Sequence, residues 1–240
     1  MLPINGLILL PNVLDETLSH EDYLPSSVGK AIQTLDGIFA ESEKGARHYL
    51  KRFTFPHPKT FRDIAISLLN EHTTDKEREE LLDPLKRGET WGIVSDCGLP
   101  ILADPGASLV YRANELGIPV SVFPGPSSII YALMLSGLSG QNFAFNGYLP
   151  RKEPFLQEKI QSLVQISQRE KQTQIFIEAP YRTEKMLEQL VRELPSHALL
   201  SLSWNLTLPT QGVITKSIKE WKKYPLPELR KTPAVFVFIC

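Results

Sequence analysis

The sequence predicts an α/β protein of two domains, the first built on a mostly parallel sheet and the second on a mixed sheet. Short apolar runs alternate with amphipathic segments through the first half of the 240 residues, as in βα units. The segment Phe123-Pro-Gly-Pro-Ser-Ser128 then stops a strand, because two prolines around a glycine impose an extended connection. Three β-rich runs without long helices between them follow towards the C-terminus. We therefore expect domains at residues 1–124 and 125–240.

The elements of the first domain follow from its hydrophobic pattern. Strands are expected at the short apolar runs 7–10, 38–40, 92–95 and 119–123. Helices are expected at 27–35, 43–53, 60–71, 75–87 and 107–116. In the last of these, Leu109, Val110 and Ala113 keep helical spacing, and Gly117 is a suitable stop.

The second domain mixes the two kinds of element. Helices are expected at 128–136, 155–166 and 183–194, and strands at 143–146 and 174–178. The β-rich runs 198–204, 212–217 and 234–239 lack intervening long helices, so we expect them to pair antiparallel.

Composition excludes several classes of protein. No apolar run approaches the ~20 residues that a membrane span needs. The first eleven residues lack a basic region and a cleavage site, so they indicate a first strand and a cytoplasmic protein. Cys97 and Cys240 form neither a disulfide framework nor a C-x-x-C pair, and five histidines form no H-x-x-x-H pair. We expect no structural metal.

The formal net charge of -1 argues against an indiscriminate nucleic-acid binder. Residues 126–240 nevertheless carry 14 Lys and Arg against 9 Asp and Glu, whereas residues 1–125 carry 12 against 18. The C-terminal half is therefore a candidate to face an anion; the alternative is ordinary scatter over solvated surfaces.

Turn-forming and polar residues are most concentrated in residues 94–106, which read Val-Ser-Asp-Cys-Gly-Leu-Pro-Ile-Leu-Ala-Asp-Pro-Gly. Ligands of open α/β sheets bind beyond the carboxyl ends of strands, and Gly98 would let backbone approach a ligand closely. The alternatives are that Asp104 caps the next helix and that Asp96 fixes a turn. Cys97 is a possible nucleophile, but without an obvious histidine partner it is better interpreted as a small packed side chain.

Ordinary cofactor motifs are absent: the sequence contains no G-x-G-x-x-G after the first strand, no G-x-x-x-x-G-K-[ST] and no G-x-S-x-G. The order of its other motifs is informative. The 94–106 loop is followed by Pro124-Gly-Pro-Ser-Ser128, Ser136-Gly-Leu138, Gly147-Tyr-Leu-Pro150 and Glu178-Ala-Pro-Tyr-Arg182. Together these motifs, over residues 90–182, resemble the tetrapyrrole methylase superfamily.

The resemblance implies two α/β domains of the tetrapyrrole methylase type, with S-adenosylmethionine in the cleft between them, and a homodimer. Within the superfamily, the sequence is most similar to members that methylate a ribose 2′-hydroxyl of small-subunit ribosomal RNA. The positions that the resemblance implies for cofactor binding are Asp96, Cys97, Gly98, Leu102, Ser127, Ser128, Ala179, Leu206, Thr207, Pro233 and Ala234. Backbone groups and apolar walls suit adenine, and oxygen atoms suit a sulfonium.

Methyl transfer needs alignment, and a ribose hydroxyl also needs a proton acceptor. Asp15, Asp96 and Glu178 are the candidates, and Glu178 is preferred because it ends a strand of the second domain. The alternative is that Glu178 only holds Arg182 or the cofactor. Arg151, Lys152 and Arg182 are expected to meet the phosphates of ribosomal RNA or the small ribosomal subunit, unless they are solvated surface charges.

Three departures from the family pattern keep other functions open. The first loop, residues 10–16, has no glycine; residues 204–208 read Trp-Asn-Leu-Thr-Leu where the family has Arg-Glu-Leu-Thr-Lys; and Leu99 replaces a threonine. One alternative is a cofactor-binding module without transfer activity. Another is the same fold methylating a tetrapyrrole or another small molecule.

Overall fold

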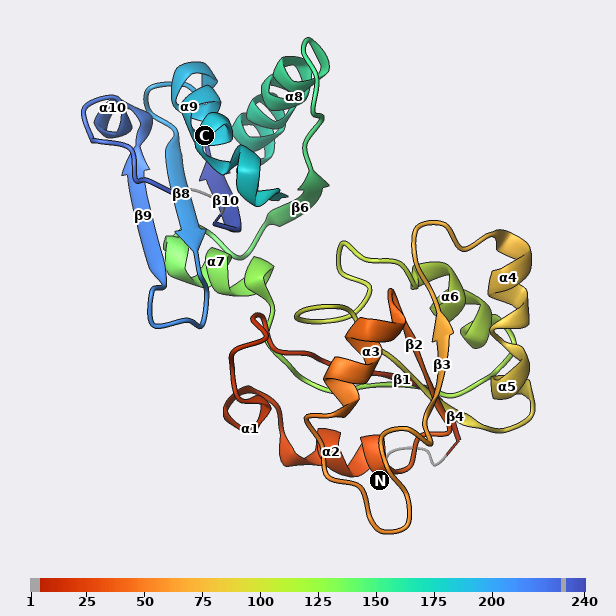
Figure 1. Ribbon diagram of the computed structural model, residues 1–240. Helices are drawn as coiled ribbons and strands as arrows, with labels where there is room; N and C mark the ends of the chain where they lie inside the picture. Colours follow the sequence, from red (N-terminus) through yellow and green to blue (C-terminus); the bar gives the residue numbers. More distant parts are fainter. Residues whose placement is uncertain (1–4, 230–231) are drawn as a thin grey trace. The chain divides into compact units, whose positions relative to one another are not determined.

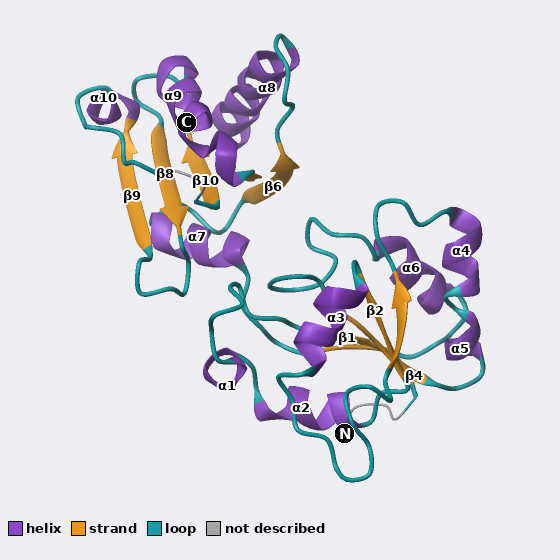
Figure 2. Cartoon of the chain, viewed as in Figure 1, coloured by secondary structure: helices purple, strands orange, loops and turns teal. Residues whose placement is uncertain are grey.

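The computed structural model describes residues 5–229 and 232–240. The chain forms two compact units, Met1–Ser127 and Ser128–Cys240. Figures 1 and 2 label their elements, and each unit is described by itself. The division falls within the Pro-Gly-Pro-Ser-Ser segment that separates the two sequence patterns.

The N-terminal unit is built on a five-stranded sheet of order β3-β2-β4-β1-β5, in which every pairing is parallel. Its strands are β1 (Gly6–Leu9), β2 (Gly37–Ala40), β3 (Ala65–Leu68), β4 (Thr90–Ile93) and β5 (Val120–Val122). Its helices are α1 (His20–Tyr23), α2 (Ser26–Gln33), α3 (Glu43–Leu50), α4 (Asp75–Glu80), α5 (Asp83–Lys86) and α6 (Ala107–Glu115). The predicted parallel sheet is confirmed.

Both faces of this sheet are covered, because consecutive strand residues point to opposite sides. Ile8 and Ile38 pack with α2 and α3, whereas their neighbours Leu7 and Phe39 pack with residues of α5 and α6. A strand buried on both faces reads as a continuous apolar run, which explains why the short runs were recognisable in the sequence.

Two predicted helices of this unit are wrong. Residues 60–71 do not form a helix: Asp63 accepts hydrogen bonds from the backbone and hydroxyl of Thr60, which closes a turn, and β3 then pairs in parallel with β2. Pairing at a sheet edge overrides the local periodicity here. The helix expected over 75–87 is divided into α4 and α5, and Pro84 starts the second of these.

The C-terminal unit contains a second five-stranded sheet, of order β6-β7-β10-β8-β9. Its strands are β6 (Phe143–Tyr148), β7 (Thr173–Glu178), β8 (Leu199–Trp204), β9 (Gly212–Ser217) and β10 (Ala234–Ile239). Strands β6 and β7 are parallel, and the other pairs are antiparallel. The predicted mixed sheet is confirmed, including its antiparallel C-terminal strands.

The remaining elements of this unit are α7 (Ser128–Ser136), α8 (Phe155–Glu170), the 3-10 helix η1 (Pro180–Arg182), α9 (Thr183–Glu193) and α10 (Ile218–Trp221). Residues of α8, α9 and α10 share one core with the sheet, which includes the stacked rings of Phe176 and Phe236. Helix α7 packs against β7, β8, β9 and β10, and the hydroxyl of Thr215 on β9 donates to the backbone oxygen of Ser136.

No helix within residues 5–229 and 232–240 is long and apolar enough to cross a bilayer.

Candidate functional site

The N-terminal unit gathers polar residues where three neighbouring strands end. Strands β2, β4 and β1 lie side by side and run parallel, so their carboxyl ends meet at one edge of the sheet. The residues that follow them include Glu41 after β2, Ser95 and Asp96 after β4, and Asn12 after β1. The 94–106 loop therefore starts at the edge where open α/β sheets bind ligands.

Asn12 ties the first loop to the loop after β4. Its buried side-chain amide donates to the backbone oxygens of Asp96 (2.9 Å) and Ser95 (3.2 Å), and its Oδ1 accepts from the backbone of Val13 (2.9 Å). Its backbone N–H also donates to the oxygen of Gly98 over 2.8 Å. An amide side chain with both donors and its acceptor engaged fixes the path of both loops.

Gly98 is conformationally required at this junction. Its φ of 69° lies in the left-handed region, and a Cβ there would lie 3.2 Å from Leu14 Cδ2 and 3.4 Å from the oxygen of Pro126. Its N–H donates to the oxygen of Val13 over 3.2 Å, and its own oxygen accepts from Asn12. Both backbone polar groups of this glycine are thus used to hold the first loop.

Three carboxylates lie near one another at this edge: Glu41, Asp96 and Asp104. Burial, followed by the charges of Asp104 and Asp96, raises the pKa of Glu41. Burial and the charge of Asp96 also raise the pKa of Asp104, although a hydrogen bond from Ser95 opposes the shift. Crowded carboxylates of this kind favour a positively charged ligand and are common at functional sites. Among the described residues, no group of His, Cys, Asp and Glu side chains is arranged to hold a metal ion.

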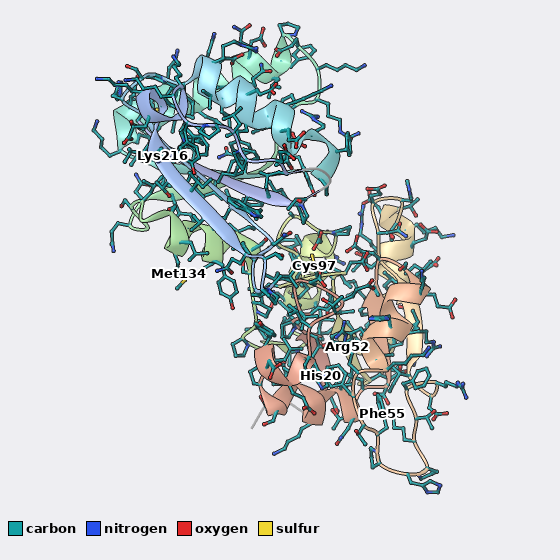
Figure 3. The ribbon with its side chains drawn as sticks, turned by 60° about the vertical axis from the view of Figure 1, so that its left-hand side comes forward. His20, Arg52, Phe55, Cys97, Met134 and Lys216 are labelled. Carbon is teal, nitrogen blue, oxygen red and sulfur yellow. The ribbon has the colours of Figure 1, made fainter. Side chains whose placement is uncertain are left out.

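Two interpretations of this loop from the sequence are corrected. Asp104 does not cap α6: the N-cap is Gly106, and the helix has no side-chain cap. Cys97, which Figure 3 labels, is exposed in the same loop and is not the packed side chain expected from the sequence. Partial desolvation and the charges of Asp104, Asp96 and Glu41 raise the pKa of its thiol. A thiol with a raised pKa stays protonated near neutral pH and is a poor nucleophile.

In the C-terminal unit, the predicted cofactor residues gather at one end of the second sheet. The register places Glu178, Ala234, Trp204 and Gly212 in one row across β7, β10, β8 and β9. The predicted residues that flank this row are Ala179, Leu206, Thr207 and Pro233, with Ala234 inside it. The antiparallel course of β10 brings its start beside the ends of β7 and β8, which sequence order alone does not reveal.

Backbone strain marks two of the predicted cofactor loops. Five non-glycine residues in the described chain have positive φ. Two of them, Ile101 (76°) and Ala103 (73°), flank Leu102, and two others, Asn205 (48°) and Thr207 (74°), flank Leu206. Leu102 is 46% exposed, whereas Leu206 is buried. Strain of this kind is typical of ligand-binding loops.

The other predicted cofactor residues, Ser127 and Ser128, lie where one unit ends and the other begins. Ser127 is 5% exposed, and Ser128 is the first residue of α7.

Glu178 and Arg182 form an ion pair at the end of β7. Glu178 Oε2 lies 3.1 Å from Arg182 Nη2, and both side chains are largely buried. Glu178 Oε1 accepts from the backbone of Ala179 over 2.7 Å. Oε2 has no partner in hydrogen-bond geometry within the described structure, so this oxygen keeps acceptor capacity. Arg182 is therefore engaged by a carboxylate, unlike Arg151 and Lys152, which are exposed in the connection after β6.

Asp15, the third predicted proton acceptor, lies in the first loop. It accepts hydrogen bonds from the backbone and the hydroxyl of Thr17, at 2.9 and 2.5 Å. These bonds, with a smaller contribution from Arg52, lower the pKa of Asp15 and make it a weaker base.

Sequence reasoning missed two features of the N-terminal unit. Glu41 escaped notice although it directly follows a buried strand, which was the available signal. The other is a set of cations on and just after α3, which line a cavity of about 470 Å³ together with Asn12 and Asp96. The helical spacing of these cations is present in the sequence. The net charge of residues 1–125 is negative, however, so sequence reasoning did not single them out.

Comparison with known proteins places this architecture in a family. The family model described as Tetrapyrrole (Corrin/Porphyrin) Methylases matches residues 18–222. A protein named Ribosomal RNA small subunit methyltransferase I from Xylella fastidiosa is 33% identical over 73% of this chain and 60% of its own length. Relatives of the same name from Vibrio cholerae and Thermotoga maritima are 30% and 29% identical, over 82% and 83% of this chain and 62% and 86% of their own lengths.

Several of these matches span only about 60% of the relatives' lengths. Solved structures share the fold. A diphthine synthase superposes with a TM-score of 0.63 at 13% identity, covering 97% of this chain and 89% of its own. The methyltransferase CobJ superposes with a TM-score of 0.60 at 17% identity, covering 97% and 93%. The chain therefore belongs to the tetrapyrrole (corrin/porphyrin) methylase family.

Proposed function

We propose that the chain is an S-adenosylmethionine-dependent methyltransferase that methylates a ribose 2′-hydroxyl of small-subunit ribosomal RNA. The observation that carries the proposal is its similarity to Ribosomal RNA small subunit methyltransferase I, at about 30% identity over most of this chain. Family membership supports the methyl transfer, and the relatives' name supports small-subunit ribosomal RNA as the substrate.

The cofactor would supply a methyl group activated on a sulfonium. In the N-terminal unit, Asp96, Cys97, Gly98, Leu102 and Ser127 are proposed to contact it. The negative charge of Glu41, Asp96 and Asp104 supports a cationic ligand, and the exposed side chain of Leu102 supports an apolar contact. In the C-terminal unit, the proposed contacts are Ser128, Ala179, Leu206, Thr207, Pro233 and Ala234.

Glu178 is the proposed proton acceptor for the ribose hydroxyl. Its Oε2 has acceptor capacity left, and its ion pair with Arg182 holds the carboxylate in place. The opposing role, in which Glu178 only orients Arg182, rests on the same contact. The two roles differ in what a glutamine at this position would do, as described in the Discussion.

Arg151 and Lys152 are proposed to contact phosphates of the RNA, because they are exposed and have no acidic partner within 4 Å in the described chain. Arg182 is proposed to do so only secondarily, since Glu178 already engages its charge. A ribosomal substrate supports a cytoplasmic location, and the family resemblance supports a homodimer.

Mass mapping of methyl groups in small-subunit ribosomal RNA, from cells with and without the gene, tests the function. One ribose methyl group should be absent without the gene and should return when purified protein and S-adenosylmethionine are added to the unmodified small subunit. Identical methyl maps, together with no transfer in the purified reaction, would exclude this acceptor.

The family description favours one other function, methylation of a tetrapyrrole. The same purified protein, incubated with S-adenosylmethionine and uroporphyrinogen, would then yield a methylated macrocycle. Transfer to the macrocycle but not to the small subunit would favour this second function.

A further inference from the structure

Five cationic or basic side chains share one side of the segment that contains α3. They are Lys44, Arg47, His48, Lys51 and Arg52. Spacings of three, four, seven and eight residues bring side chains to the same helix face, and two turns separate Lys44 from Lys51, or about 10 Å along the axis. The helix is held at its start by Ser42, whose hydroxyl accepts from the backbone of Gly45 over 3.0 Å.

This face lines two cavities. The first, of about 470 Å³, is walled by all five side chains together with the acidic Glu16, and it reaches Asn12 and Asp96 of the candidate site. The second, of about 420 Å³, is lined by Arg47, Lys51, Phe61 and Arg62. Arg47 and Lys51 belong to both, so the two cavities form one continuous basic surface, which we call the α3 surface.

The arginines shape this surface without losing their charge. Arg47 Nη1 donates to the backbone oxygens of Phe61 (2.9 Å) and Ile64 (3.1 Å). Arg52 donates to the oxygens of Leu18 (2.8 Å) and Glu16 (3.0 Å). Carbonyl oxygens are neutral, so they position the two guanidinium groups while leaving a positive potential in the cavities.

The lysines are available for a ligand. Lys44 and Lys51 are exposed, and neither forms a hydrogen bond or ion pair with the described residues. Lys51 Nζ lies 5.6 Å from the centre of the Phe61 ring, and the guanidinium of Arg62 lies 5.4 Å from it. Phe61 is therefore an aromatic ring flanked by two cations, a combination that suits stacking against a nucleobase beside its phosphate.

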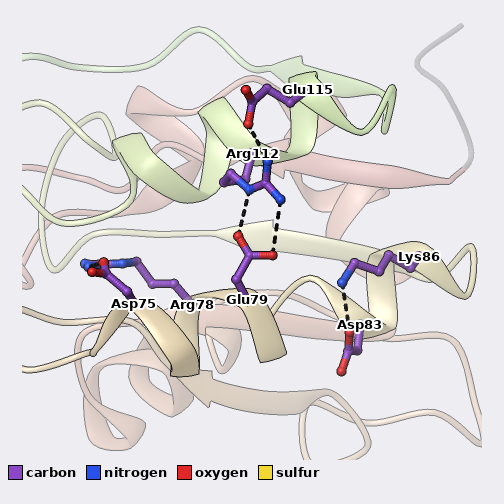
Figure 4. Close-up of polar contacts among 7 residues, drawn as sticks. All are labelled: Asp75, Arg78, Glu79, Asp83, Lys86, Arg112 and Glu115. Atoms are coloured by element: carbon purple, nitrogen blue, oxygen red, sulfur yellow. Dashed lines mark hydrogen bonds and ion pairs between the residues drawn. The ribbon is translucent and has the colours of Figure 1, made fainter.

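Helices α4, α5 and α6 of the same unit show the opposite arrangement. On α4, α5 and α6, cations are neutralised by acids (Figure 4). Arg112 bridges Glu79 and Glu115, Lys86 pairs with Asp83, and Arg78 pairs with Asp75. None of the four Lys and Arg side chains in the larger cavity has an acidic partner within 4 Å in the part of the chain that the structure describes. Their charge is left for an external anion.

We propose that the α3 surface binds the phosphodiester backbone of the RNA substrate, with Lys44 and Lys51 contacting phosphates. This inference rests on the proposed function and adds a second RNA contact, in the unit whose total charge is negative. A spread of cations over two joined cavities fits successive phosphates, and Phe61 fits a base. Asp96 lies against the first turn of α3, since a Cβ at Gly45 would lie 2.7 Å from its Oδ1, so bound RNA would adjoin the candidate site.

The test compares two double variants of the full chain. Lys44→Ala with Lys51→Ala removes two unpaired cations, and Lys76→Ala with Lys86→Ala removes two exposed, ion-paired cations from the same unit. Affinity for small-subunit ribosomal RNA is measured across a salt titration, and affinity for S-adenosylmethionine by calorimetry. The α3 variant should bind RNA about tenfold more weakly and reduce the slope of log K against log salt by about 1.4–1.8. Its cofactor affinity and thermal unfolding should match wild type, and the α4–α5 variant should bind RNA as wild type does.

The outcomes separate this inference from the proposed function. If wild type methylates and binds the RNA but the α3 variant keeps its affinity and salt slope, the α3 surface is not an RNA contact and the proposed function stands. If wild type binds no ribosomal RNA, both fail. Restored affinity and slope in Lys44→Arg with Lys51→Arg would support a contact made by charge. Uroporphyrin, a polycarboxylate, serves as the second probe. If the α3 variant loses affinity for uroporphyrin but not for RNA, the surface binds a macrocycle and the inference is overturned.

Discussion

The side-chain amide of Asn12 donates a hydrogen bond to the backbone oxygen of Asp96 over 2.9 Å, across 84 positions of sequence. The same amide donates to the backbone oxygen of Ser95. Two backbone hydrogen bonds, from Asn12 to Gly98 and from Gly98 to Val13, connect the same two loops. The first loop and the loop after β4 therefore form one structural element. Asn12 lies in the first loop, residues 10–16, which has no glycine, and its hydrogen bonds fix that loop to the loop after β4.

Asn12→Leu should lower the free energy of unfolding by about 1–3 kcal/mol, because it leaves the buried oxygen of Ser95 and the partly buried oxygen of Asp96 without this donor. Urea unfolding followed by circular dichroism measures this. Asn114→Leu, the same change at an exposed position of α6, should stay within ~0.5 kcal/mol of wild type. Equal stability of the two variants would mean that Asn12 does not hold the loops.

Gly98→Val should weaken S-adenosylmethionine binding by at least tenfold, since it forces the loop after β4 away from Leu14 and Pro126. Gly117→Val is the control: Gly117 has the same φ of 69°, but a Cβ there meets nothing within 4 Å. Both variants should lose about 1–2 kcal/mol of stability from backbone strain. Calorimetry on the folded proteins separates them, and an unchanged dissociation constant for Gly98→Val would remove this loop from the cofactor site.

Glu178→Gln should slow single-turnover methyl transfer by ~10²–10⁴ while cofactor affinity changes little, if the carboxylate accepts the hydroxyl proton. If Glu178 only orients Arg182, stability or affinity should fall together with the rate. Arg182→Met serves as the partner variant, because it removes the ion pair and keeps the carboxylate. A wild-type single-turnover rate in Glu178→Gln would eliminate the proton-acceptor role.

Glu41→Gln should stabilise the protein at neutral pH. The pKa of Glu41 is raised above its ordinary 4.5 in the folded state, so the unfolded chain releases this proton at a lower pH than the folded chain does. Wild type therefore loses stability as the pH rises from the unfolded pKa to the folded pKa of Glu41. The variant cannot ionise, and its advantage should appear above pH 4.5 and persist to pH 7.

Glu77→Gln is the control of opposite sign for that experiment. Hydrogen bonds from the backbone and hydroxyl of Thr74 lower the pKa of Glu77, so its ionised form contributes stability that is lost as pH falls. This variant should be less stable than wild type at pH 7. Urea unfolding from pH 3.5 to 7 compares the two, and parallel curves for wild type and Glu41→Gln would contradict the assigned burial and charge effects.

Arg151→Ala with Lys152→Ala should lower affinity for small-subunit ribosomal RNA and flatten its salt dependence, without changing cofactor affinity. Lys222→Ala with Lys223→Ala removes an adjacent, exposed pair of the same unit and should have no such effect. A filter-binding titration at several salt concentrations measures both. Identical salt slopes for the two variants and wild type would identify Arg151 and Lys152 as ordinary surface charges.

Local patterns were sufficient for much of the fold. The predicted spans of α7, β9 and β10 agree with the structure, because apolar periodicity and turn residues act within each segment. The prediction failed at β3 and at the division between α4 and α5. There the outcome depends on pairing with β2 and on Pro84, and an amphipathic pattern alone does not distinguish a short edge strand from a helix.

By itself, the sequence determined the fold class, the mixed second sheet and the family, since these depend on patterns and motif order along the chain. Only the tertiary structure decided which residues come together: Asn12 with the backbone of Asp96, Glu41 with the charge of Asp104, and Glu178 with Ala234 in one row of the sheet. It also decided which cations keep their charge free, because acids reach Arg112 and Lys86 but not Lys44 and Lys51 within the described chain. Coulomb interactions depend on distance in space, and a net charge summed along the sequence contains no such distance.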